Sequence, residues 1–386
     1  MEGVIEYGYT SLNKQGEELC GDKVEIAVRG DYTTLVLADG LGSGVKANIL
    51  ATLTSIIMCT MVSNNIPIEE CVETMIDTLP VCKVRGVAYS TFSVAHIDNR
   101  GRGHLVEFDN PQAVCISGGR CKDLPRERRE VCGKTIYLSP INLSPNDTIV
   151  LMSDGAIYAG VGKLLNFGWQ RPDITDYIDR NMRPDYSARS IAWLVASACN
   201  DLYMGLPGDD TTVAALRFRP IERVSLMVGP PINKEDDREW VERFVSQAGK
   251  KIVCGGTTSQ IVSRQTGAPL TTTFDFPDRN IPPIGRIKGI DLTTEGIITL
   301  RRVLELSEKY ASTSDLTAKS FDLTDGASQI AEMLFETCTD INFFVGQGVN
   351  KAHNGLPIDT TMKLKLIESL ARNLKTMGKR INIYYA

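Results

Sequence analysis

Histidine is scarce in this sequence, and closely spaced cysteine pairs are missing. Only three histidines occur among 386 residues, His96, His104 and His353, which argues against a histidine-based triad or a histidine-rich metal site. Ten cysteines are spread along the chain, and no two are separated by just two residues. This spacing is neither a zinc pattern nor a small disulfide framework. Several cysteines fall within apolar runs, as reduced core thiols do, so we expect a cytoplasmic protein.

Long segments made only of apolar or only of basic residues are also missing. Residues 1–7 have no basic segment followed by an apolar one, so we expect no export signal. The most apolar run, residues 49–62, is too short to span a bilayer and contains Thr and Ser, so we expect a core helix and no membrane partner. The net charge is −5, and the charge cluster at 126–130 has mixed signs and is predicted to be a solvated hairpin or loop. We therefore expect no nucleic-acid partner.

The chain is long enough for two or three domains. Residues 1–219 contain predicted strands, then two long helices, then strands again, which predicts an α+β sandwich of antiparallel sheets flanked by helices. After Arg219-Pro220 the strands alternate with helices. This rhythm predicts a smaller three-layer α/β domain over residues 220–386, with a mostly parallel sheet covered on both faces.

One predicted hairpin in the first domain brings two acidic residues together. The runs 24–28 and 33–38 flank a turn and end in charged residues on the same side. Because the two strands are antiparallel, Asp22 at the start of one and Asp39 at the end of the other should be neighbours. Glycines follow Asp39 at positions 40, 42 and 44 and allow close approach of another group.

Two further acidic residues stand at strand ends. Asp154 ends the apolar run 148–152, and Asp209 precedes the run 213–218. Taken one at a time, each of these Asp residues is also what an ordinary turn requires. Together they form an all-oxygen donor set, which suits Mg²⁺ or Mn²⁺. Two such cations sharing a carboxylate can hold a hydroxide in line with a phosphorus atom, and this reaction needs no nucleophilic side chain.

These residues resemble the metal-dependent PPM/PP2C protein phosphatases, and specifically their SpoIIE-like bacterial branch. The matching motifs are, in chain order, Gly21-Asp22, Ala38-Asp39-Gly40-Leu41-Gly42-Ser43-Gly44 with Ala47, Ser153-Asp154-Gly155 and Gly208-Asp209-Asp210-Thr211-Thr212-Val213. The resemblance covers residues 1–218. It implies a PP2C-like β-sandwich and a phosphatase that hydrolyses phosphoserine or phosphothreonine on a protein in bacterial signalling.

The resemblance also implies roles for single residues. Asp39 matches the carboxylate that bridges two Mn²⁺ or Mg²⁺ ions, and the carbonyl of Gly40 matches a ligand of one of them. Asp154 and Asp209 match the acids that complete the shell of the other ion. Asp22 matches the acid that contacts the metal site through water. The phosphate-binding arginine of eukaryotic members has no counterpart near Asp22.

The helix predicted after the glycines has apolar residues at helical spacing, which predicts its buried face. These residues are Val45, Ile49, Leu53, Ile56, Ile57 and Met61. Because this helix starts directly after Asp39 and Gly40, we expect a shift of its first turn to alter metal occupancy.

The second domain carries a weaker signal. Gly255, Gly256, Thr257 and Thr258 follow a predicted strand and open a helix, where free backbone N–H groups can receive an anion. The same residues also suit a capped helix with a tight turn. Cys254 is expected to be a buried core thiol rather than a reactive one. We expect this domain to regulate the phosphatase through a small anionic ligand or a protein partner.

Three functions fit the sequence. The first is a metal-dependent serine/threonine protein phosphatase. The second is a pseudophosphatase or partner-switching regulator that binds a phosphoprotein with little turnover, and the third is a phosphatase of small molecules. The sequence leaves a homodimer, the substrate and the physiological metal open.

Overall fold

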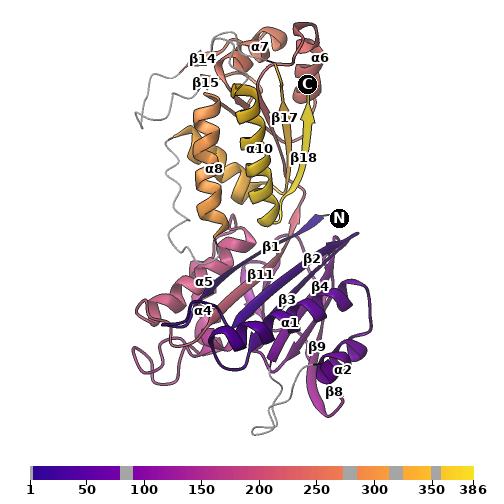
Figure 1. Cartoon of the computed structure of the whole chain (residues 1–386), viewed down its shortest axis with the longest axis vertical. Helices are drawn as coiled ribbons and strands as arrows, with labels where there is room; N and C mark the ends of the chain where they lie inside the picture. Colours follow the sequence, from indigo (N-terminus) through magenta and orange to yellow (C-terminus); the bar gives the residue numbers. More distant parts are fainter. Residues whose placement is uncertain (1–2, 79–89, 273–284, 313–324, 349–357) are drawn as a thin grey trace. The chain divides into compact units, whose positions relative to one another are not determined.

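The structure is a computed structural model that describes residues 3–78, 90–272, 285–312, 325–348 and 358–386. The chain divides into two compact units, Met1–Pro220 and Ile221–Ala386 (Figure 1). Each unit has its own sheets and its own hydrophobic core, so each is described by itself.

The first unit contains two antiparallel sheets packed face to face. One sheet has the strand order β1-β11-β10-β6-β7. Its strands are β1 (Gly3–Leu12), β11 (Thr211–Pro220), β10 (Thr148–Met152), β6 (Val114–Ser117) and β7 (Arg120–Lys122). The other sheet has the order β2-β3-β4-β5-β9-β8. Its strands are β2 (Asp22–Arg29), β3 (Tyr32–Gly40), β4 (Ser90–Asp98), β5 (Arg102–Phe108), β9 (Lys134–Asn142) and β8 (Glu127–Val131).

The packing of strand β3 explains why residues 35–38 form a continuous apolar run. Leu35 and Leu37 point into the core between the two sheets, where they join residues such as Ile149 of β10. Val36 and Ala38 point to the opposite face and join a second core beneath helices. Because successive side chains of a strand alternate between faces, a strand buried on both faces must be apolar throughout.

Helices cover the outer faces of this sandwich, as Figure 1 shows for α1, α4 and α5. The helices are α1 (Gly44–Ser63), α2 (Ile68–Thr78), the short α3 (Asp154–Ile157), α4 (Arg171–Asn181) and α5 (Ala188–Leu202). α1 and α2 share a buried core with β3 and β4, and α5 packs against β1 and β11. The predicted α+β sandwich with flanking helices is therefore confirmed.

The predicted buried face of α1 is wrong. Val45 is 63% exposed and Ile49 53%, and the later apolar residues Leu53 and Ile56 are both exposed at 46%. The face that packs on the sheet instead contains Leu50, Met58 and Val62 together with the small residues Ala47 and Ala51. The small side chain of Ala47 lets the first turns of the helix approach Gly40 closely. By length and composition α1 could also cross a membrane, a test that the core helices of soluble proteins also meet.

The second unit is built on one seven-stranded sheet with the order β14-β15-β16-β13-β12-β17-β18. Its strands are β14 (Thr271–Thr272), β15 (Gly285–Arg286), β16 (Leu292–Thr294), β13 (Lys250–Cys254), β12 (Arg223–Val228), β17 (Asp340–Val345) and β18 (Arg380–Tyr385). The run from β16 to β18 is parallel, and β14 and β15 form an antiparallel edge. Parallel strands need helical crossovers, which explains the alternation in sequence.

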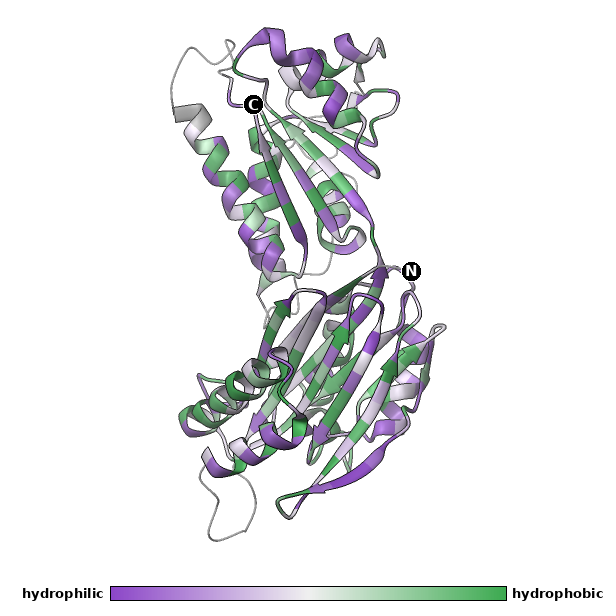
Figure 2. Cartoon of the chain, turned by 90° about the vertical axis from the view of Figure 1, so that its right-hand side faces the viewer, coloured by the Kyte–Doolittle hydropathy of each residue, from purple (hydrophilic) through white to green (hydrophobic). Residues whose placement is uncertain are grey.

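Helices cover both faces of this sheet. They are α6 (Asp237–Val245), α7 (Gly256–Thr266), α8 (Ile297–Ala311), α9 (Gly326–Glu332) and α10 (Ile358–Thr376), together with the short turns η1 (Lys234–Asp236) and η2 (Met333–Thr337). α8, α9 and α10 share one core with the sheet, and α6 and α7 share another. Figure 2 shows hydrophobic residues along the strands of both units. The predicted three-layer α/β arrangement is confirmed.

Four short strands escaped the prediction, namely β7, β8, β15 and β16. Residues 126–130 were predicted as a hairpin or loop, but Glu127–Val131 forms β8 at the edge of a sheet. Its charged side chains are exposed on both faces, so it lacks the alternation that reveals a strand. Charges of this kind protect an edge strand from pairing with another chain. β16 has only three residues, too few for a period to be seen.

Candidate functional site

The predicted acidic residues of the first unit come from both sheets. Asp22 begins β2 and lies opposite Asp39 of β3 in the antiparallel ladder, which confirms the predicted hairpin. Asp154 is the first residue of α3, directly after β10. Asp209 lies two residues before β11, which pairs with β10. The ends of four strands therefore deliver these carboxylates to the same edge of the sandwich.

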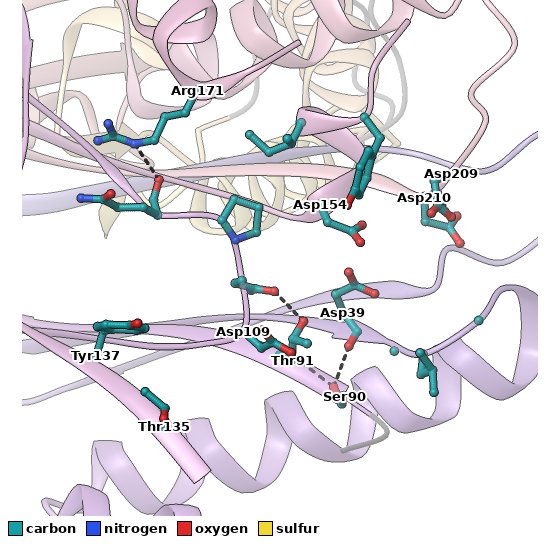
Figure 3. A pocket seen from close by; sticks show the side chains of 18 of the residues that line it. Asp39, Ser90, Thr91, Asp109, Thr135, Tyr137, Asp154, Arg171, Asp209 and Asp210 are labelled. Atoms are coloured by element: carbon teal, nitrogen blue, oxygen red, sulfur yellow. Dashed lines mark hydrogen bonds between the residues drawn. The ribbon is translucent and has the colours of Figure 1, made fainter. Parts of the chain in front are cut away.

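One pocket of about 1020 Å³ collects most of these residues. Asp39, Gly40, Asp154, Asp209 and Asp210 all line it. Figure 3 shows Asp39 and Asp154 facing each other from opposite sides of the pocket, with Asp209 and Asp210 beside them. We refer to this part as the acidic end of the pocket.

A buried hydrogen-bond chain fixes Asp22 next to the pocket. The hydroxyl of Ser153 donates to Oδ2 of Asp22 at 2.7 Å, and the backbone N–H of Thr212 donates to the Ser153 oxygen at 2.8 Å. Ser153 is completely buried. Ser153 lies between β10 and Asp154, and Thr212 belongs to β11. These two hydrogen bonds therefore hold the ends of β2, β10 and β11 in register.

Next to the acidic end, two buried carboxylate oxygens have no hydrogen-bond partner among the described residues. They are Oδ1 of Asp22 and Oδ2 of Asp210. The other oxygen of Asp210 accepts a hydrogen bond from the backbone N–H of Lys14 at 2.9 Å. A buried acceptor without a partner is costly, so these oxygens mark a place that a donor or a cation would stabilise.

The carboxylates also hinder each other's ionisation. Burial raises the pKa of Asp39 well above its usual range, and the nearby charges of Asp22, Asp154 and Asp209 raise it further. Burial likewise raises the pKa of Asp22, although the hydrogen bond from Ser153 opposes this. The pKa of Asp154 is raised by burial and by the charge of Asp209. Positive charge placed among them would reverse these shifts.

The donor set fits hard divalent cations. It consists of carboxylates with a backbone carbonyl at Gly40, and oxygen ligands of this kind suit Mg²⁺ and Mn²⁺. In the described ranges no three Asp, Glu, His or Cys side chains already converge closely enough to form a metal shell. These side chains would therefore have to move closer together to share a cation.

Lys14 is a site residue that the sequence did not reveal. Its Nζ lies 3.5 Å from Oδ1 of Asp209, and its side chain lines the acidic end. The sequence showed no arginine near Asp22, and the structure places this lysine beside Asp209. Lys14 stands in a loop after β1 without any motif around it, so only the fold could show its position.

The predicted anion site of the second unit lies at the start of α7. Gly255 has a φ of +111°, and its N–H donates to the carbonyl of Thr294 at 2.9 Å. The hydroxyl of Thr258 accepts from the N–H of Gly229 at 3.0 Å. The N–H of Gly255 is thus used within the fold and the hydroxyl of Thr258 serves there as an acceptor, while Gly256 begins α7. Cys254 is fully buried, as expected, and burial raises the pKa of its thiol to about 12.

Comparison with known families now identifies the first unit. Residues 29–219 match the family described as "Stage II sporulation protein E (SpoIIE)". The first unit carries a SpoIIE-family domain. This confirms the resemblance to the SpoIIE-like branch of PP2C-type phosphatases that the motifs indicated.

Solved structures resemble the chain at low sequence identity. The PP2C phosphatase domain of SpoIIE from Bacillus subtilis, with a fragment of its regulatory domain, is 18% identical with a TM-score of 0.48 and covers 56% of this chain and 64% of that one. The RsbU and RsbW domains of a Mycobacterium tuberculosis protein are 17% identical with a TM-score of 0.46, and the match covers 63% of this chain and 68% of that one. RsbX in complex with magnesium is 19% identical with a TM-score of 0.41, and the match covers 55% of this chain and 95% of that one. No curated protein matches the sequence.

Proposed function

We propose that this protein is a divalent-cation-dependent phosphatase that hydrolyses phosphoserine or phosphothreonine on a protein in cytoplasmic bacterial signalling. One observation carries the proposal. Within a SpoIIE-family domain, carboxylates from both sheets face one pocket at its acidic end. No nucleophilic side chain is needed for such a reaction, which suits a chain with so few histidines.

The residues of the acidic end have distinct parts in this proposal. Asp39, Asp154, Asp209 and the carbonyl of Gly40 would hold two Mn²⁺ or Mg²⁺ ions, with Asp39 between them. When bound, the ions supply a nucleophile at neutral pH and positive charge for the phosphoryl group. Asp22 orders water at the site, because Ser153 holds one of its oxygens and leaves the other without a partner.

Lys14 adds a positive charge beside Asp209. A phosphate monoester that enters the acidic end must overcome repulsion from several carboxylates. A lysine is a common phosphate ligand and acts as a point charge. We infer that Lys14 helps to bind and orient the phosphoryl group, a task for which no arginine was found near Asp22.

Hydrolysis of p-nitrophenyl phosphate with added Mn²⁺ tests the proposal. Asp39→Asn should lower kcat/KM by at least about 100-fold, since even changes to groups that only support metal ligands cost 10–100-fold. The matched control is Asp109→Asn, which removes one carboxylate from the same pocket but none of the proposed metal ligands. It should keep near-wild-type turnover.

The alternative functions predict different results. A pseudophosphatase would bind phosphoproteins without turnover, and a metabolite phosphatase would hydrolyse small phosphomonoesters but no phosphoprotein. All four acidic positions are present, which favours turnover. Treating phosphoproteins of the source organism with the enzyme and Mn²⁺ separates the three cases.

We further propose that the second unit regulates this activity by binding a small anionic ligand or a protein partner near Gly255–Thr258. The position of Gly256 at the start of α7 supports this, because the N-terminus of a helix that follows a parallel strand can receive an anion at the carboxyl edge of the sheet. A chain ending at Pro220 should then differ from the full protein in activity or substrate choice. Identical behaviour of the two proteins would contradict the proposal.

A further inference from the structure

The active-site pocket has a second end with the opposite charge. Away from the carboxylates, its lining includes the three arginines Arg126, Arg128 and Arg171, together with Tyr137. Figure 3 shows Tyr137 and Arg171 on the side of the pocket away from Asp209 and Asp210. We call this part the arginine end. The proposed reaction at the acidic end does not use it.

Arg126 is held rigidly at the arginine end. Its Nε lies 3.0 Å from Oε2 of the buried Glu107. Its guanidinium carbon lies 3.9 Å from the centre of the Tyr137 ring, in the geometry of a cation–π contact. Within the described part of the chain, these are its contacts, and both terminal nitrogens remain free to donate. A guanidinium fixed in this way loses little entropy when it binds an anion.

Arg171 is fixed by different partners. Its Nε donates to the carbonyl of Gln112 at 3.2 Å and its Nη2 to the carbonyl of Ala113 at 3.1 Å. Nη2 also lies 2.6 Å from a carboxylate oxygen of Asp123. No partner of its other terminal nitrogen, Nη1, is found among the described residues. Arg171 therefore also presents an unused donor in a fixed orientation.

Arg128 extends the arginine end along the edge strand β8. Its Nη2 pairs with Glu130 on the surface at 2.9 Å. The next residue, Arg129, points to the other face of β8 and pairs with Glu69 of α2 at 3.0 Å. These neighbours are thus similar in chemistry but only Arg128 lines the pocket.

Each of the three arginines pairs with a carboxylate: Arg126 with Glu107, Arg171 with Asp123 and Arg128 with Glu130. The lining of the pocket includes the arginines but not these three carboxylates, so the pocket wall itself presents guanidinium groups. The whole chain has a net charge of −5, so a local excess of arginine is not a general surface property. Three guanidinium groups around one pocket form a site for carboxylate or phosphate.

We propose that the arginine end is a second anion subsite, which selects phosphoproteins carrying an acidic side chain near the phosphorylated residue. The inference rests on the proposed phosphatase function and names the substrate class. The phosphoryl group occupies the acidic end, while a carboxylate of the same polypeptide segment binds the arginines. A second phosphate group has the same chemistry and forms the other arm of the test.

Binding and turnover of three peptides test this subsite. Each carries one phosphoserine, flanked by Glu residues, by Gln residues, or by a second phosphoserine. Wild-type protein with Mn²⁺ should bind non-hydrolysable phosphonate versions of the Glu peptide about tenfold more tightly than the Gln peptide, as expected for hydrogen bonds to charged groups. The preference should shrink at high salt. A doubly phosphorylated peptide that binds well while the Glu peptide does not would overturn the choice of carboxylate.

Variants localise the effect. Arg128→Gln should reduce the Glu-to-Gln preference about twofold to fivefold, as for an exposed charge pair, and Arg129→Gln should leave it unchanged. Arg126→Gln is combined with Glu107→Gln so that no buried carboxylate loses its partner, and this double variant should remove most of the preference. None of these variants should change kcat/KM for p-nitrophenyl phosphate, which reaches only the acidic end.

The outcomes separate the two proposals. Turnover of p-nitrophenyl phosphate without any Glu preference, or an equal loss in Arg128→Gln and Arg129→Gln, overturns the subsite and leaves the phosphatase standing. A Glu preference in phosphonate binding without turnover of any substrate overturns the phosphatase and supports the subsite.

Discussion

Gly40 is the point where the acidic end touches helix α1, and Gly40→Ala tests whether that helix sets the geometry of the site. A Cβ atom at residue 40 would lie 2.7 Å from the carbonyl carbon of Ala47 and 2.9 Å from its Cα. The carbonyl oxygen of Ala47 would lie closer still, and real Cβ atoms essentially never approach other atoms within 3.0 Å, so β3 and α1 must move apart. Ala47 is fully buried and has no room to yield.

The displacement should reach the carboxylates. Asn48 in the next position donates to the carbonyl of Cys20 at 2.8 Å, which ties α1 to the turn before Asp22. Overpacking of this kind costs about 1–3 kcal/mol of stability. Changes in the groups that support metal ligands cost about 10–100-fold in metal affinity or activity. We expect Gly40→Ala to raise the Mn²⁺ concentration for half-maximal activity at least about tenfold.

The matched control is Gly103→Ala. Its Cβ would lie 2.8 Å from Cα of Ile97 and 2.9 Å from the carbonyl carbon of His96, a clash of the same size between β4 and β5. Gly103 does not line the pocket. Urea unfolding measures the stability of both variants, and Mn²⁺ titrations of p-nitrophenyl phosphate hydrolysis measure the site. The reasoning is refuted if folded Gly40→Ala has a wild-type Mn²⁺ requirement, or if Gly103→Ala raises that requirement equally.

Two other predictions concern a lysine and a histidine. Lys14→Met should raise KM for p-nitrophenyl phosphate about twofold to fivefold, the range for a partly exposed charge, and should lower the Mn²⁺ concentration needed for activity. The control Lys122→Met, away from the pocket, should change neither quantity. An unchanged KM in Lys14→Met would exclude phosphate binding by this residue. Burial, helped by the charge of His104, lowers the pKa of His96 to about 4, so the unfolded chain binds a proton first as the pH falls below about 6.5. Between pH 7 and pH 5 the free energy of unfolding, measured with urea, should therefore lose about 2 kcal/mol more in the wild type than in His96→Gln. An equally steep change in His96→Gln would contradict this origin.

The acidic end could be predicted because it depends on local patterns. The apolar run 35–38 is buried on both faces, and such a run is visible without any partner. The hairpin that pairs Asp22 with Asp39 follows from two short runs and a turn. The apolar runs of these strands end at charged residues and glycines, so the carboxylates at these ends could be named in advance.

Other features could not be predicted because they depend on packing between distant segments. The exposed face of α1 carries Val45 and Ile49, the residues that hydrophobicity alone assigns to the core. The buried face instead carries Ala47, whose small side chain lets α1 approach Gly40 closely. Lys14 reaches Asp209 across most of the length of the first unit's sequence. The charged strand β8 has no apolar alternation and is a strand only because β9 pairs with it.

The sequence by itself determined the order of elements, the family of the first unit and the carboxylates of the acidic end, because all three are written in short runs of neighbouring residues. Only the tertiary structure decided that these carboxylates share a pocket with Arg126, Arg128 and Arg171. Those arginines are separated from the acids by whole strands, and charges on different strands meet only when the sheets pair and the sandwich closes. The substrate preference that we propose therefore arises from the fold rather than from any motif.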